Sequence, residues 1–305
     1  MKKGKIVVFG SFVVDLTSRA SHLPVPGETV IGSKFKLGPG GKGSNQGVAA
    51  HRAGADVIMA TKVGNDVFGK VATDFYTAEG MDTRYIFIDD AVETGTALIM
   101  VDENSGQNQI LVVSGACGHI ADEDIEAAMP AILEADILLL QLEINLDALE
   151  KLVQIAHNNG KMVVLNTAPA QKIPAGILEK TDIVTPNEIE AGILTGVEIK
   201  SPGDAIKAGE AFMQMGVLNV VITLGKDGVF VMTKDRHELI PSIKVNAIDT
   251  TGAGDAFNGG FVTALAEGMD IFEAARFGNI TGALSVTRLG TAPAMPFRKE
   301  IDDLF

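Results

Sequence analysis

Short runs of β-branched and aliphatic residues alternate along the chain with longer segments whose apolar residues recur at helical spacing. The helical spacing is clear in residues 145–158 and 202–215. The short apolar runs, which are typical of buried strands, lie at residues 6–9, 57–61, 137–140, 162–165, 183–185 and 220–224. This alternation predicts an α/β fold with a mostly parallel central sheet and helices on both faces, in three layers, α/β/α.

Two stretches, at about residues 13–38 and 94–113, interrupt the alternation. They contain alternating or aliphatic segments, at 29–37, 97–101 and 110–113, and turn residues such as Asn104, Ser105 and Gly106. We expect extra strands here, which form a small β-sheet lid inserted into a single α/β domain that spans residues 1–305.

The charge and cysteine content narrow the class of protein. The 305 residues include 25 Lys and Arg against 39 Asp and Glu, so the net charge is −14, which argues against nucleic acid or a membrane surface as a partner. The single cysteine, Cys117, forms no internal disulfide and is expected to be a packing residue. No apolar run is long enough to cross a membrane, and the N-terminal run ends at Asp15 without a cleavage pattern, so we expect a cytoplasmic protein.

A glycine-rich segment at residues 38–43 matches the letters of the dinucleotide-binding pattern G-x-G-x-x-G. Its context is poor for a nicotinamide or flavin site, because it follows an expected lid strand rather than the first central strand. A flexible loop and a binding loop both fit the spacing. The helix that follows favours binding, because its backbone N–H groups, the Lys42 ammonium and the Asn45 amide would converge on one polar ligand.

Residues 247–257 contain a second glycine-rich segment, in which Gly252, Ala253 and Gly254 precede a helix expected over residues 255–266. The free N–H groups at that helix start would form an anion hole for a transferred phosphoryl group. Asp255, in the first turn, would accept the proton of an attacking hydroxyl. The alternative is that Asp255 simply caps the helix.

A third candidate site lies where the expected strand 183–185 passes into a helix. Thr185-Pro186-Asn187-Glu188 stands at the carboxyl edge of the sheet, where open α/β proteins bind ligands. The side-chain oxygens of Asn187 and Glu188 suit hydrated Mg²⁺. The alternative for Asn187 is an N-cap.

Taken together, these segments give the chain a resemblance to the PfkB carbohydrate kinase family along essentially its whole length. The matching segments occur in the family's order and spacing, at residues 10–15, 40–46, 141–143, 166–170, 185–188 and 249–257. The resemblance implies ATP-dependent phosphorylation of the 5-hydroxyl of D-ribose to ribose 5-phosphate. The alternative substrates are 2-deoxyribose, another pentose or ketose, and a nucleoside.

The resemblance also implies roles for individual residues. Asp255 corresponds to the catalytic base, and Gly252, Ala253 and Gly254 to the anion hole. The sugar contacts correspond to Val13, Asp15, Gly41, Lys42, Asn45, Glu143 and Asp255. The nucleotide contacts correspond to Asn187, Thr223, Gly225, Gly228, Gly254 and Asn279, with Glu188 near the Mg²⁺ shell.

Two further properties follow from the resemblance. A potassium ion is expected beside the anion hole, held mostly by backbone carbonyls at Asp249, Thr251, Ser285, Arg288 and Gly290, while Ala294 stands where a serine often contributes. The lid implies a homodimer in which the lids of two subunits pair.

Val13 departs from the family pattern, which commonly has asparagine at this position. Valine offers no hydrogen bond, and a buried hydroxyl without a partner costs about 1–3 kcal/mol, so the substitution favours a sugar such as 2-deoxyribose. Two other classes of protein are alternatives to a kinase. A sugar sensor without catalysis would have lost Asp255 or the Gly252 and Gly254 anion hole, which are present, and a nicotinamide-linked oxidoreductase would rest on residues 38–43 alone.

Overall fold

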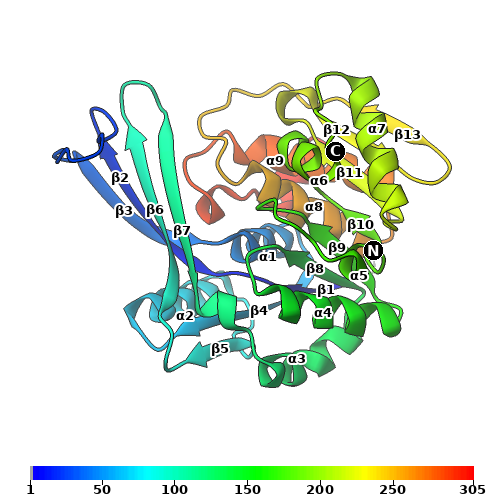
Figure 1. Ribbon diagram of the computed structural model, residues 1–305, viewed down its shortest axis with the longest axis horizontal. Coiled ribbons are helices and arrows are strands. Elements are labelled where there is room, and N and C mark those ends of the chain that lie inside the picture. The colour runs from blue at the N-terminus through cyan, green and yellow to red at the C-terminus, as the bar shows by residue number, and fades with distance from the viewer. Residues whose placement is uncertain (1–2) are drawn as a thin grey trace.

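The computed structural model describes residues 3–305 and is built on a nine-stranded sheet in the order β13-β12-β11-β10-β9-β8-β1-β4-β5 (Figure 1). Its seven parallel strands are β1 (Lys5–Phe9), β4 (Asp56–Gly64), β5 (Ile86–Asp89), β8 (Ile137–Gln141), β9 (Met162–Asn166), β10 (Ile183–Val184) and β11 (Asn219–Thr223). An antiparallel hairpin, β12 (Val229–Met232) and β13 (His237–Ile240), completes one edge. The predicted mostly parallel sheet is confirmed.

Helices cover both faces of this sheet, because side chains alternate along each central strand. In β1, Ile6 and Val8 pack into one core and Val7 and Phe9 into the other. The first core contains α1 (Lys42–Arg52), α2 (Val67–Glu79), α8 (Ala253–Ala266), α9 (Ile271–Ser285) and α10 (Arg298–Asp302). The second contains α3 (Asp122–Glu134), α4 (Leu146–Asn158), α5 (Ala175–Leu178), α6 (Glu188–Thr195) and α7 (Pro202–Gln214). The three-layer α/β/α fold is therefore confirmed.

Three short 3₁₀ turns, η1 (Ala116–His119), η2 (Gly225–Asp227) and η3 (Ala292–Ala294), complete the connections. Among the helices of residues 3–305, none has the length and apolar character that a membrane crossing requires.

A second sheet of four strands stands apart from the nine-stranded sheet at one side of the molecule (Figure 1). We call it the small sheet. Its order is β3 (Lys34–Gly40), β2 (Val13–Ala20), β6 (Thr94–Asp102) and β7 (Asn108–Gly115). The strands expected at 97–101 and 110–113 lie within β6 and β7. The strand expected from residue 29 begins only at Lys34, because residues 21–33 form a loop with turn and bend geometry.

The glycine-rich segment at residues 38–43 connects the small sheet to the body, because β3 passes directly into α1 there. Gly41 has a φ of +91°, which a residue with a side chain adopts only under strain. A Cβ atom at Gly43 would lie 2.6 Å from the carbonyl carbon of Gly10, so the start of α1 rests against the chain just after β1. As expected, the segment follows a strand of the small sheet rather than β1.

Helices α1 and α8 lie side by side and run in the same direction. Gly259 of α8 has no room for a Cβ atom because Ala49 and the backbone of α1 occupy that space. One turn further along, Thr263 Oγ1 donates to the carbonyl of Ala50 at 3.3 Å. This packing brings the first turns of the two helices together.

Candidate active site

Asp255 lies in the first turn of α8 and is buried, with 7% of its surface exposed. Asn45 Nδ2 donates to Asp255 Oδ2 at 2.9 Å, and Gln46 Nε2 donates to Asp255 Oδ1 at 3.0 Å. Both donors come from the first turn of α1. The capping interpretation of Asp255 is wrong, because no side chain caps α8 and both carboxylate oxygens accept hydrogen bonds from another helix.

Gln46 is itself held by side chains at the ends of two central strands. Its Nε2 also donates to Asn166 Oδ1 at 3.0 Å, and its Oε1 accepts from Gln141 Nε2 at 2.8 Å. Asn166 Nδ2 in turn donates to the Thr185 carbonyl at 2.7 Å. This buried network fixes the orientation of the Asp255 carboxylate.

Burial raises the pKa of Asp255, because a carboxylate loses favourable hydration in the interior. Lys42 and the two amide donors oppose this rise, and Glu143 adds to it. Burial also disfavours the Lys42 ammonium, but Asp255, Glu143 and Glu190 outweigh that cost and raise the pKa of Lys42. The site therefore pairs a carboxylate suited to accept a proton with a lysine that stays charged.

The start of α8 presents backbone N–H groups beside Asp255. Gly252 occupies the N-cap position with a φ of +77°. The N–H of Ala253 donates to the Thr250 carbonyl at 3.3 Å, whereas those of Gly252 and Gly254 have no acceptor within residues 3–305. Unpaired N–H groups at a helix start attract negative charge, so those of Gly252 and Gly254 are suited to hold an anion.

Glu143 and Lys42 lie together near Asp255. Glu143 follows β8, and its Oε2 accepts hydrogen bonds from Ser11 Oγ at 2.5 Å and from the backbone N–H of Lys42 at 2.9 Å. Asn45 is only 4% exposed, and its Oδ1 has no hydrogen-bond partner within residues 3–305. An acceptor left free beside a carboxylate and an ammonium suits a ligand with several hydroxyl groups.

Asp15 on β2 lies beside these groups. Its Oδ2 accepts from Thr291 Oγ1 at 3.4 Å, and its carboxyl packs against Gly40, where a Cβ atom would clash with it. Burial raises the pKa of Asp15 to about 7, and Asp255 and Glu143 contribute to the rise. Val13, two residues earlier on the same face of β2, is 4% exposed. The structure thus brings together Val13, Asp15, Gly41, Lys42, Asn45, Glu143 and Asp255.

The predicted nucleotide residues form a second group. Asn187 pairs with Thr223 in a β-bridge, and it caps α6 because its Oδ1 accepts from the Glu190 N–H at 2.8 Å. The N-cap interpretation of Asn187 is therefore confirmed. Gly225 begins η2, and Gly228 directly follows it and packs against the Ile240 carbonyl. Asn279 Nδ2 donates to the Pro241 carbonyl at 2.8 Å. Glu188 is the first residue of α6.

Hydrogen bonds connect this second group to the start of α8. Thr185 Oγ1 donates to Asn258 Oδ1 at 2.6 Å, and Asn258 Nδ2 donates to the Gly254 carbonyl at 2.8 Å. The carboxyl ends of β10 and β11 and the anion hole therefore lie at one edge of the sheet.

Two loops that carry the predicted potassium-binding residues also meet. Asp249 Oδ1 accepts from the Thr251 N–H and Asp249 Oδ2 from the Gly290 N–H, both at 3.0 Å. The side chains of Ser285 and Arg288 point to other partners, since Ser285 Oγ donates to the Gly282 carbonyl and Arg288 pairs with Glu300. If Ser285 and Arg288 bind a cation, they therefore do so through their backbone carbonyls. Ala294 is buried in η3.

Sequence reasoning did not assign a site role to Gln46, Glu190 or Thr291. Gln46 lies in the first half of the helix that follows the glycine-rich segment, next to Asn45, which the sequence did assign to the site. The spacing Asn187-x-x-Glu190 is a capping box and predicts where Glu190 lies, although not that it faces Lys42. No local pattern indicates Thr291, which reaches Asp15 through tertiary structure alone.

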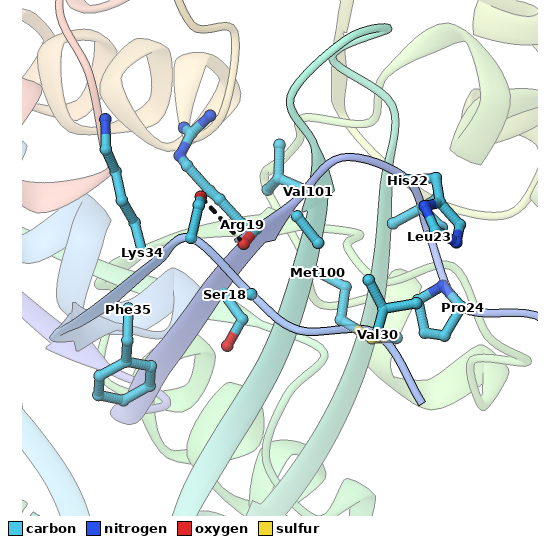
Figure 2. Close-up of a pocket in the computed structure, with 13 residues that line it drawn as sticks. Ser18, Arg19, His22, Leu23, Pro24, Val30, Lys34, Phe35, Met100 and Val101 are labelled. Carbon is cyan, nitrogen blue, oxygen red and sulfur yellow. Dashed lines mark hydrogen bonds between the residues drawn. The ribbon is translucent and has the colours of Figure 1, made fainter. Parts of the chain in front are cut away.

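A cavity of about 360 Å³ lies elsewhere, at the outer end of the small sheet (Figure 2). It is lined by the loop at residues 21–33 and by β2, β3 and β6, including Arg19, His22, Lys34, Phe35 and Met100.

Comparisons with known proteins agree with this arrangement. A sequence model of the pfkB family carbohydrate kinases matches residues 3–298. The chain is 43% identical over 295 residues to a ribokinase of Haemophilus influenzae, covering 97% of this chain and 96% of that protein. It is 34% identical to a deoxyribokinase of Salmonella typhi over 299 residues, covering 98% and 97% of the two chains. A structure of Arabidopsis thaliana ribokinase complexed with ribose and ATP is similar with a TM-score of 0.91 and 28% identity, over 100% of this chain and 99% of that one.

Proposed function

Because the chain belongs to the pfkB family of carbohydrate kinases, we propose that it transfers the γ-phosphoryl group of ATP to O5 of D-ribose, giving ADP and ribose 5-phosphate. The observation that carries this proposal is the placement of the buried Asp255 carboxylate beside the free N–H groups of Gly252 and Gly254. A proton acceptor and an anion hole are the two parts that phosphoryl transfer to a hydroxyl requires.

In the proposed reaction, the sugar hydroxyl lies between Asp255 and the γ-phosphorus. The O5–phosphorus bond forms while the bond from phosphorus to the β–γ bridging oxygen breaks, and the O5 proton passes to Asp255. The N–H groups at the start of α8 and the Lys42 ammonium stabilise the negative charge of the transferred group and of the leaving ADP. The amides of Asn45 and Gln46 keep the carboxylate aimed at the hydroxyl.

The sugar would bind among Asp15, Lys42, Asn45 and Glu143, whose carboxylate, ammonium and amide groups match a ring of hydroxyls. Ribokinase relatives and the ribose complex of the Arabidopsis protein support D-ribose. The deoxyribokinase relative and the apolar side chain of Val13 support 2-deoxyribose as the alternative.

Two metal ions belong to the proposal. Mg²⁺ usually binds through one or two carboxylates together with substrate phosphates and water, which fits the single carboxylate of Glu188 at the start of α6. Hydrogen bonds from Thr251 and Gly290 outweigh the effect of burial and lower the pKa of Asp249, so this carboxylate stays negative where the two loops meet. That charge and the neighbouring carbonyls of Thr251, Ser285, Arg288 and Gly290 suit a potassium ion.

The small sheet is proposed to act as a lid over the sugar and to pair with the small sheet of a second copy. Its strands carry Asp15 and Val13 into the site, and its exposed apolar residues, considered below, support pairing. A cytoplasmic location is supported by the free, buried thiol of Cys117 and by the use of ATP.

The proposal is tested by measuring ADP release with ATP, Mg²⁺ and potassium, comparing D-ribose with 2-deoxy-D-ribose at matched low concentrations to obtain the ratio of kcat/KM. We expect turnover of both sugars, with ribose preferred. A preference for deoxyribose would make the alternative correct, and turnover of neither would overturn the pentose assignment. Replacing potassium by choline chloride in the same assay tests the cation, whose removal is expected to lower the rate.

A further inference from the structure

Three cations line one face of the small sheet. Arg19 lies opposite Lys34, and Thr17 lies opposite Lys36, in the antiparallel pairing of β2 with β3, so all four side chains share the face that carries Asp15. Figure 2 shows Arg19 and Lys34 pointing to the same side of the sheet, and Phe35 pointing to the other. No hydrogen bond or ion pair joins Arg19, Lys34 or Lys36 to a side chain within residues 3–305.

Lys36 is the member of this set that reaches the body of the protein. Its Nζ lies 3.6 Å from the point that a Cβ atom at Gly290 would occupy. The next residue, Thr291, donates to Asp15 and packs against Gly252 at the start of α8. The Lys36 ammonium therefore stands over the loop that separates Asp15 from the anion hole.

Two other carboxylates lie near Asp15 and oppose its ionisation, so a nearby cation affects its charge. Asp255 of α8 and Glu143 after β8 both place negative charge near Asp15, and Thr291 supplies one hydrogen bond at 3.4 Å. Lys42 of α1 acts on Asp255 and Glu143, whereas the Lys36 ammonium favours the charged form of Asp15, with an effect smaller than those of burial, Thr291, Asp255 and Glu143. A partly buried carboxylate near two others ionises more readily when a cation lies on the same face of the sheet.

We propose that Lys36 is a positioning residue for sugar binding, which favours the charged form of Asp15 that accepts hydrogen bonds from sugar hydroxyls. This rests on the proposed function, in which Asp15 contacts the sugar. Burial raises the pKa of Asp15 to about 7, and Lys36 opposes the rise, so loss of Lys36 places the protonation of Asp15 at a higher pH. Since a protonated Asp15 accepts less well, sugar affinity is full above the pKa and falls as the pH drops through it.

The test measures sugar binding by calorimetry from pH 5.5 to 9 in the absence of nucleotide, for the whole protein and for Lys36→Met, Lys36→Arg and Lys34→Met. D-Ribose is the probe. For Lys36→Met we expect the loss of affinity at acidic pH to begin at a higher pH, so that binding of D-ribose at pH 6 weakens by about twofold to threefold and equals that of the parent above pH 9. Arginine is expected to restore the parent profile. Lys34→Met removes a cation farther along the same strand and is expected to leave the profile unchanged.

The number of protons taken up or released on sugar binding gives a second measurement. It would not change if Lys36 had a purely structural role. Sugar binding near pH 7 is expected to release protons, seen as a dependence of the binding enthalpy on the ionisation enthalpy of the buffer, and Lys36→Met is expected to shift the maximum of this release to higher pH. At saturating sugar, kcat for Lys36→Met is expected to stay close to the parent value at pH 9.

The variant Asp15→Asn distinguishes a failure of the role proposed for Lys36 from a failure of the proposed sugar site. If Asp15→Asn binds weakly at every pH but Lys36→Met has the same profile as Lys34→Met, the role of Lys36 is overturned and the sugar site stands. If Asp15→Asn binds D-ribose as tightly as the parent, with the same pH dependence, the proposed sugar site is overturned as well.

Discussion

The carboxylate of Asp255 is buried and that of Asp15 is partly buried in the same site, and their hydrogen-bond partners differ. Asp255 accepts two amide hydrogen bonds, at 2.9 and 3.0 Å, from the first turn of α1. Asp15 accepts one from a hydroxyl at 3.4 Å. The first arrangement fixes a proton acceptor in a single orientation, and the second leaves a carboxylate whose remaining acceptor positions are available to a ligand.

We expect Asp255→Asn to lower kcat by about 10²–10⁴-fold, because an amide accepts no proton from the sugar hydroxyl. ATP affinity, measured by calorimetry, is expected to change little. Asp147→Asn is the matched control, since Asp147 is an exposed aspartate in the first turn of α4. Turnover within a few fold of the parent enzyme would show that Asp255 is not the base.

Val13 provides a test of sugar preference. An asparagine at this buried position offers a hydrogen bond to a sugar hydroxyl, and an unpaired hydroxyl costs about 1–3 kcal/mol. We therefore expect Val13→Asn to raise the ratio of kcat/KM for D-ribose over 2-deoxy-D-ribose by about tenfold, measured by ADP release. A ratio equal to that of the parent, in a variant with an unchanged melting temperature, would remove Val13 from the determinants of specificity.

Helices α1 and α8 place their first turns together because glycines allow close packing at both of their contacts. Gly43 lets α1 rest on the end of β1, and Gly259 lets α8 rest on α1. The glycine-rich segment at residues 38–43 therefore also has a packing role, through Gly43. Its spacing alone did not distinguish a flexible loop from this close contact.

Gly43→Ala tests the contact between α1 and β1. The new methyl group would lie 2.6 Å from backbone of Gly10, so we expect destabilisation by about 1–3 kcal/mol from overpacking, measured by urea unfolding. The matched control is Gly203→Ala in α7, where the methyl group would meet only Ser201 Oγ at 3.8 Å. The control is expected to gain stability of up to about 1 kcal/mol, because alanine favours a helix over glycine. Equal effects at both positions would contradict the close packing.

The small sheet exposes several large apolar side chains to solvent. On one face of this sheet, the exposed side chains of Leu111 and Val113 of β7 lie beside Leu98 of β6 and, across β2, on the same face as Leu37 and Phe35 of β3. An exposed apolar surface of this kind marks an interaction site. It supports the expected pairing between the small sheets of two copies.

Leu111→Asp is expected to shift the protein from dimer to monomer, because a carboxylate buried at an apolar interface is strongly disfavoured. Molar mass by light scattering across a range of protein concentrations measures the change. Leu111 is 62% exposed, and Val67→Asp on α2, where Val67 is 76% exposed, is the control for adding an aspartate to an exposed apolar position. A parent protein that is monomeric at all concentrations would contradict the proposed pairing.

Local patterns in the sequence determined the layers of the fold and the segments that carry the chemistry. The alternation of Ile6 and Val8 with Val7 and Phe9, and the glycines before Asp255, are visible along the chain because they involve residues close together in sequence. The sequence did not predict the strands β5, β12 and β13, because a strand of four residues carries little periodic signal.

Tertiary structure alone decided which groups act on one another. The hydrogen bonds of Asn45 and Gln46 to Asp255, and that of Thr291 to Asp15, join residues more than 200 positions apart. No local pattern encodes such pairs, because they depend on how helices and loops pack after the chain has folded. The same holds for the charge on Asp15 and its dependence on Lys36, since a pKa follows from burial and neighbouring charges that exist only in the folded protein.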